Sequence, residues 1–183
     1  MKPQTLILAG ALYLAVALAP FSAQAAITMV LDLGSDTPGE SQVDGHANQI
    51  DVLSWSWGLS NSGSVAGAVG KANFQDLSLT KYVDKSSPKL MLDCASGAHL
   101  PTATLYCLKS IGAGKPYEYV KITLTEVQVT SVSTGGSGGQ DRLTENVTLN
   151  FAKVKYDYQT QNPDGSPGST VSFTWNVANN LPN

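Results

Sequence analysis

Hydrophobic and polar residues alternate with a period of two through most of the chain after residue 26, which predicts antiparallel β-strands. Trp55 and Trp57 share one face of their predicted strand with Leu53. Ser54 and Ser56 lie on the other face, because neighbouring side chains leave opposite faces of a strand. We therefore expect the tryptophans in the core and the serines on a small polar surface. The predicted strands are Ile27–Leu33, Asn48–Leu59, Ala72–Val83, Thr102–Lys109, Tyr117–Ser133, Leu143–Tyr158 and Thr170–Val177.

Several of these strands change the parity of their apolar positions part-way along. The strand Tyr117–Ser133 changes at Thr125-Glu126, where we predict a β-bulge, and Ala72–Val83 slips near Asp76. Long strands that change phase midway are bent, and a small closed barrel requires bent strands. The pattern predicts a mainly β fold, a small antiparallel β-barrel.

The segment Ser87–Gly97 predicts the single short α-helix. Its first serine can cap the free N–H groups, the proline after it suits the first helical position, and its final glycine suits a left-handed stop. Leu90, Met91 and Cys94 then share a face. A short amphipathic helix among strands most simply closes one end of the barrel.

Residues 1–25 have the pattern of an export signal. Lys2 supplies a positive start, Leu6–Ala19 is apolar and uncharged, and Ala23-Gln24-Ala25 is an A-x-A cleavage site. A membrane-spanning helix needs about 20 apolar residues, and Pro20 ends this run earlier. We expect cleavage before residue 26; the alternative is an upstream extension of a gene that starts near Met29. The chain then divides into a leader, 1–25, and one β-barrel domain, 26–183.

The composition of the domain narrows the choice of partners. Removing Lys2 with the leader leaves 11 − 1 = 10 basic residues against 14 acidic ones, a net charge of −4. This mild acidity, without a Lys/Arg block, gives no reason to expect nucleic acid or a membrane surface as a partner. Charged residues make up only 14% of the chain, so much of its surface is neutral and suits association with other subunits.

Four segments together resemble the haemolysin-coregulated protein (Hcp) family of type VI secretion. They are the glycine hinge between two strand-forming runs in Thr130–Phe151, the phrase IDVLSWSWG at Ile50–Gly58, the stretch Phe74–Met91, and the motif GES…D…H at Gly39–His46. The resemblance runs in the same order over residues 27–183.

The resemblance implies a structural role. Members of this family form hexameric rings that stack into the inner tube of the secretion machine; a contracting sheath ejects the tube with its spike, and the lumen carries small effector cargo. The resemblance matches Ser56 to a position that lines the ring lumen. Ser54 lies on the same face of the strand, so both side chains are expected to face cargo. We expect a secreted protein with a possible periplasmic route. Because family members usually lack an export leader, the alternative is an exported binding or adhesion module independent of the machine.

The sequence contains no convincing catalytic group, metal site or cofactor motif, so we expect that the protein is not an enzyme. The run Gly135–Gly139 satisfies G-x-S-x-G, but a strand follows it and both histidines lie upstream. The phosphate-loop-like Gly67–Ala72 lacks a magnesium-binding hydroxyl. Glu40, Asp44 and His46 could hold a metal, but a solvated polar loop explains them better.

Cys94 and Cys107 are the chain's two cysteines. In an oxidising compartment they could form a disulfide between helix and barrel, which would add about 3 kcal/mol by restricting the unfolded chain. The alternative is two small buried hydrophobic residues that never meet. The segment Ser60–Lys71 is predicted to be a loop, either a flexible surface connection or, as the resemblance implies, one that reaches toward a neighbouring ring.

Overall fold

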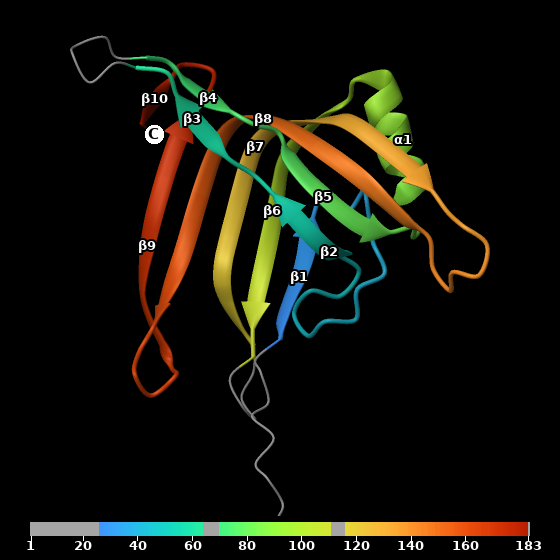
Figure 1. Cartoon of the computed structure of the whole chain (residues 1–183), viewed down its shortest axis with the longest axis horizontal. Coiled ribbons are helices and arrows are strands. Elements are labelled where there is room, and N and C mark those ends of the chain that lie inside the picture. The colour runs from blue at the N-terminus through green and yellow to red at the C-terminus, as the bar shows by residue number, and fades with distance from the viewer. Residues whose placement is uncertain (1–25, 64–69, 111–115, 183) are drawn as a thin grey trace, which may run out of the picture.

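The computed structural model describes residues 26–63, 70–110 and 116–182, and the predicted leader lies outside them. This part of the chain holds one helix and ten strands (Figure 1). In chain order they are β1 (Ile27–Asp32), β2 (Ile50–Ser56), β3 (Leu59–Asn61), β4 (Ala72–Phe74), β5 (Leu77–Tyr82), α1 (Ser87–Ser96), β6 (His99–Lys109), β7 (Tyr117–Gly135), β8 (Thr144–Gln161), β9 (Pro167–Asn176) and β10 (Leu181–Pro182).

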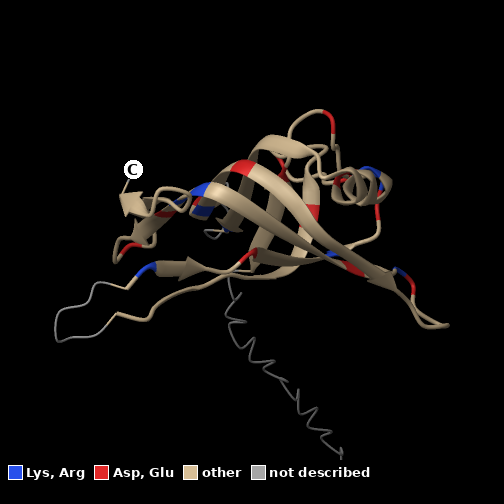
Figure 2. Cartoon of the chain, turned by 90° about the horizontal axis from the view of Figure 1, so that it is seen from above, with Lys and Arg blue, Asp and Glu red and all other residues tan. Residues whose placement is uncertain are grey.

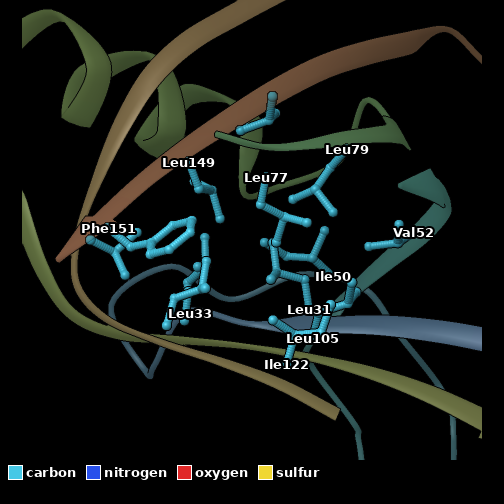
Figure 3. Packing of buried hydrophobic residues seen from close by; sticks show 14 of the residues in the cluster. Leu31, Leu33, Ile50, Val52, Leu77, Leu79, Leu105, Ile122, Leu149 and Phe151 are labelled. Carbon is cyan, nitrogen blue, oxygen red and sulfur yellow. The ribbon is translucent and has the colours of Figure 1, made fainter. Parts of the chain in front are cut away.

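Six antiparallel strands close into a barrel. The ladder runs β8-β5-β2-β1-β6-β7, and the pairing of β7 with β8 closes it. Apolar side chains of all six strands meet inside, with Leu31, Ile50 and Leu105 almost without solvent exposure (Figure 3). This confirms the predicted fold class, a small antiparallel β-barrel with one short helix.

Two of the predicted strands are each divided in the structure. Instead of one strand over Asn48–Leu59 and one over Ala72–Val83, β2 pairs with β5, while β3 and β4 form a separate two-stranded hairpin. The break before β5 coincides with the phase slip predicted near Asp76. The hairpin projects from the barrel, and residues 64–69 of the predicted loop lie outside the described part.

The predicted parity change at Thr125-Glu126 occurs, but its cause differs from the predicted bulge. Two consecutive residues point outward in each of three neighbouring strands: Pro101 and Thr102, Thr125 and Glu126, Ala152 and Lys153. The pairings Thr102↔Thr125 and Thr125↔Lys153 keep the same register on both sides of this point. No strand gains an extra residue there, so the three strands bend together at one shared corner. The irregularity in pairing between β7 and β8 lies instead between Val129 and Ser131.

The long strand β8 extends beyond the barrel and carries a wing. Its first half pairs with β5, whereas its second half, Lys153–Gln161, pairs with β9. Because β9 has only the two-residue β10 on its other side, most of its outer edge is unpaired within the described chain. The wing lies at one end of the long axis of the molecule, and α1 lies at the other (Figure 1).

The helix begins with Ser86 at its N-cap position and a proline in its first turn, and it ends at Gly97 in the left-handed conformation, φ 67°. The predicted capping role of Ser87 is wrong: its hydroxyl accepts a hydrogen bond from the Asp84 N–H and is buried against the barrel. Met91, predicted to share the apolar face, is exposed, and Leu90 is the apolar residue that is fully buried. No helix in the described residues is long and apolar enough to span a membrane.

Candidate functional site

The predicted serines belong to a larger polar surface on the outside of the barrel. Ser54 pairs with Thr80 and Ser56 with Ser78 across β2 and β5, and both serines are exposed. The same two rows continue across β8 and β7, because the pairs between these strands place small polar residues opposite each other. We call this surface the hydroxyl face; it consists of Ser54, Thr80, Asn146 and Ser133 in one row and Ser56, Ser78, Thr148 and Ser131 in the other.

Hydrogen bonds between neighbouring strands order these side chains. The Thr80 hydroxyl donates to the Asn146 amide oxygen at 2.8 Å. At the end of the rows, the hydroxyls of Thr130 and Thr148 are 2.8 Å apart. Such contacts hold short side chains in place while leaving most of the surface free to hydrogen-bond to another molecule.

Two charged residues that could interrupt the hydroxyl face point into the barrel instead. Lys81 follows Thr80, and Glu145 precedes Asn146, so alternation turns both inward; each is only 1% exposed. The Lys81 ammonium lies 2.7 Å from Glu145 and 2.8 Å from Asp84, and the Ser87 hydroxyl donates to Glu145 at 2.7 Å. This buried cluster joins β5, β8 and the start of α1. It leaves the outer surface uncharged along β5 and along residues 144–150 of β8.

The strand that carries the serines departs from the simple alternation expected for it. The pairing of β2 with β5 shifts between Val52 and Ser54, and this irregularity turns Leu53 outward, where it is 39% exposed. The prediction that Leu53 shares the core face is therefore wrong. Trp55 and Trp57 do lie on the opposite side from the serines and pack against the core, but both are half-buried rather than enclosed.

The structure does not bring the two cysteines together. Both are free: Cys94 is half-buried on α1 and Cys107 is buried on β6. The C-terminal end of α1 lies beside Gln128, which pairs with His99, the first residue of β6. Cys107 is eight residues further along that strand, about 26 Å at 3.3 Å per residue, whereas a disulfide needs Cα atoms within about 7 Å. The alternative of two separate apolar residues fits the structure.

Cys107 has a defined apolar environment of its own. Burial raises the pKa of its thiol, although the thiol also has a hydrogen bond with Trp55, which acts in the opposite direction. A buried thiol with a raised pKa reacts slowly. Cys107 therefore contributes to packing beneath the strand that carries Ser54 and Ser56.

The other segments considered for chemistry have structural surroundings. Gly135–Gly139 lies at the turn between β7 and β8, as expected for a glycine-rich turn. His46 is 2.8 Å from the Gln49 amide oxygen and packs on the Tyr106 ring, while Glu40 accepts a hydrogen bond from the Lys85 backbone N–H. Within the described ranges, no three His, Cys, Asp or Glu side chains are grouped to hold a metal ion. Residues 67–69 of the segment Gly67–Ala72 lie outside those ranges.

Comparison with known proteins assigns the family. Residues 28–158 match the family model described as "Type VI secretion system effector, Hcp". The chain belongs to the Hcp family. It is 54% identical over 161 residues to the protein hcp1 of Pseudomonas aeruginosa, a match that covers 85% of this chain and 98% of that protein.

Solved Hcp structures share the fold over nearly their whole length. The crystal structure of Hcp1 from Salmonella typhimurium is 33% identical, with a TM-score of 0.71, and the match covers 86% of this chain and 99% of that one. A structure of a type six secretion system protein gives a TM-score of 0.78 at 29% identity, over 85% and 99% of the two chains. The chain is thus a structural Hcp tube subunit of the type VI secretion system, and the match favours this role over a separate exported binding module.

The sequence prediction identified only Ser54 and Ser56 of the hydroxyl face, although the alternation within each strand indicates the other outward residues. The alternation LSLT in β5 and VTLN in β8 predicts outward Ser78, Thr80 and Thr148. Their position beside Ser54 and Ser56 could not be derived, because it depends on which strands pair and in which register.

Proposed function

We propose that this tube subunit works as a hexameric ring whose lumen is lined by the hydroxyl face. The observation that carries the proposal is the uncharged character of this surface, which the inward turn of Lys81 and Glu145 maintains across two strands. Neutral hydroxyl and amide groups suit weak, reversible contacts with varied polypeptide cargo, because they donate and accept hydrogen bonds without selecting one charge.

Two exposed apolar patches support head-to-tail association. Charged residues are scattered over the molecule rather than gathered in one block (Figure 2). The wing patch consists of Leu59, Val171, Phe173 and Leu181. The helix-side patch consists of Val83, Met91, Leu92 and Leu143. The patches lie at opposite ends of the long axis (Figure 1), so one copy's wing can cover the next copy's helix side, and such contacts repeat until the rotation closes a ring.

Complementary mutants test this arrangement. Val171→Asp disables the wing patch and Leu92→Asp the helix-side patch, so each variant alone should give a monomeric mass by light scattering, while the wild type gives a hexamer. A mixture should form a heterodimer, because each variant retains the patch that the other lacks. A wild-type protein that stays monomeric at micromolar concentration would count against the ring, and a mixture that stays monomeric would count against the two-patch contact.

The hydroxyl face is tested separately by cargo retention. Ser56→Gln narrows this surface without entering the core and should lower the amount of effector that co-purifies with rings. Ser35→Gln, in the exposed turn after β1 and away from both apolar patches, is the control. If Ser56→Gln dissociates the ring instead, this strand lies at a subunit interface. Rings of this kind would stack into the tube, inside the sheath and behind the spike.

We further propose that residues 1–25 are removed on export before residue 26, giving a periplasmic route to secretion. Mass spectrometry of the mature N-terminus tests this independently of the ring. A mature chain that retains Lys2 would indicate cytoplasmic assembly.

A further inference from the structure

A groove lies at the shared corner of β6, β7 and β8, beside the hydroxyl face. Its volume is about 430 Å³. Polar side chains from three strands converge on an apolar floor; the lining includes His99, Glu126, Gln128, Asn150, Phe151 and Val177.

The groove and the hydroxyl face form one continuous surface. His99 pairs with Gln128 and Gln128 with Asn150, so these three side chains form a row across the sheet. The Asn150 amide donates to one carboxylate oxygen of Asp76 at 2.8 Å, and the Thr130 hydroxyl donates to the other at 2.6 Å. Thr130 in turn contacts Thr148 of the hydroxyl face. A molecule bound along that face therefore reaches the groove without crossing another element.

Glu126 has an unusual backbone in the middle of β7. Its φ is 54°, in the left-handed region that favours glycine. A residue other than glycine in this conformation is strained, and strain of this kind gathers at functional sites. Glycine would form the same corner with less strain, so the backbone does not explain the glutamate. The explanation must lie in its side chain.

The Glu126 carboxylate is available for a partner. Within the described chain it has no hydrogen-bond or ion-pair partner, and neither lysine nor arginine lines the groove. Lys153 points outward in the neighbouring row, opposite Thr125, and makes no ion pair with Glu126. The groove thus offers one free carboxylate beside the two side-chain amides of Gln128 and Asn150.

We propose that this groove binds a basic peptide segment, with a lysine or arginine side chain on the Glu126 carboxylate and the peptide backbone on the amides of Gln128 and Asn150. A carboxylate and an ammonium or guanidinium group form a charge-assisted hydrogen bond, and amide side chains can pair with peptide groups. The groove and its chemistry do not depend on the proposed cargo role. Only the source of the peptide, a cargo polypeptide, rests on that proposed function. The hydroxyl face would then hold cargo without charge preference, and the groove would select a cationic segment of it.

The first arm of the test measures stability. Glu126→Gly should raise the thermal unfolding midpoint by about 2–4 °C, because glycine adopts the left-handed conformation without strain. Glu118→Gly is the matched control: the residue type, strand and substitution are the same, but Glu118 lacks a left-handed φ, lies beside the shift in pairing between β6 and β7 at Leu108, and has an ion pair with Lys121 at 3.1 Å. The control should not raise the midpoint, since it relieves no left-handed backbone and removes the ion pair. A Glu126→Gly variant that is less stable than the wild type would show that the side chain is structural and would overturn the proposal.

The second arm measures binding by fluorescence anisotropy of a labelled, uncharged-ended tetrapeptide of alternating alanine and lysine, added to the full-length mature protein. The wild type and Glu118→Gly should bind it with the same affinity, and Glu126→Gly about tenfold more weakly, the loss expected for one charge-assisted hydrogen bond. The corresponding alanine–glutamate peptide should not bind. Equal affinity of wild type and Glu126→Gly, or no binding to the wild type at millimolar peptide, would overturn the proposal. Light scattering on the same samples reports ring formation separately, so failure of the groove and failure of the ring are distinguishable.

Discussion

The two halves of β8 carry the same alternating pattern but have different surroundings. In the first half, between β5 and β7, the inward side chains Glu145, Val147 and Leu149 are fully buried. In the second half, which pairs with β9 instead of β5, burial decreases along the strand: Val154 is still buried, Tyr156 is half-buried and Tyr158 is exposed. The sequence of a strand therefore determines which side chains share a face, whereas closure of the barrel determines whether that face is buried.

The difference explains where association is expected. The barrel half buries its inward apolar residues within one subunit. The wing keeps Val171 and Phe173 exposed beside an unpaired strand edge, a combination that isolated soluble proteins avoid because it promotes pairing with other chains. In the barrel, β5 pairs with the first half of β8 and helps to bury its apolar face. On the wing, a neighbouring subunit would bury the exposed apolar side chains.

Ion pairs should show the largest difference between the two halves. Lys81→Ala removes the cation from the buried cluster and leaves the carboxylates of Asp84 and Glu145 unpaired, at a cost of about 3–5 kcal/mol in the free energy of unfolding. Lys155→Ala breaks the wing pair with Asp157, where the lysine is 51% exposed, and should cost no more than about 1 kcal/mol. Urea unfolding of a monomeric Val171→Asp background measures both. Equal losses of unfolding free energy in the two variants would mean that water reaches the Lys81 cluster as freely as the wing pair.

Apolar truncation should show a smaller difference of the same sign. Leu149→Ala leaves a cavity in the closed barrel and should cost about 2–5 kcal/mol. Phe173→Ala removes an exposed ring and should cost the subunit about 1 kcal/mol or less, because solvent already reaches that side chain. The wing variant should instead weaken the ring, seen as a lower mass by light scattering on dilution. If Phe173→Ala unfolds the subunit, the wing is part of the core rather than a contact surface.

The sequence predicted the features that are local to one strand or helix, but not those that depend on how strands pair. The alternation within β5, β7 and β8, the helix and its glycine stop, and the outward position of Ser54 and Ser56 are local properties, and they were predicted correctly. The corner at Glu126 was predicted at the right place but as a bulge, because only the unchanged register with β6 and β8 on both sides of it shows that three strands bend together. The hydroxyl face and the buried Lys81–Glu145 pair depend on which strands pair and in which register, in part between residues 64 and 66 positions apart, and alternation alone cannot supply this.

Ser56→Gln should have almost no effect on folding. Its side chain projects from the outside of the barrel half, so the free energy of unfolding should stay within about 0.5 kcal/mol of the wild type. Trp57→Ala, one residue further on, is the contrasting variant: the ring packs against Phe74 and Phe151, and its removal should cost about 2–3 kcal/mol, less than for a fully enclosed tryptophan. Urea unfolding of both variants checks whether the two faces of this segment are assigned correctly.

The smallest expected effect concerns the cysteines, which report on the two ends of the barrel separately. A reductant should leave the unfolding midpoint unchanged, and the native protein should show two thiols once unfolded, because Cys94 and Cys107 are too far apart to form a bridge. In the folded protein, a thiol reagent at pH 8 should modify Cys94 on α1 first. Cys107 should react later, since burial both limits access and raises its thiol pKa, which lowers the thiolate fraction at that pH. A Cys107 thiol that reacts as fast as Cys94 in the folded protein would contradict its enclosure in the barrel core.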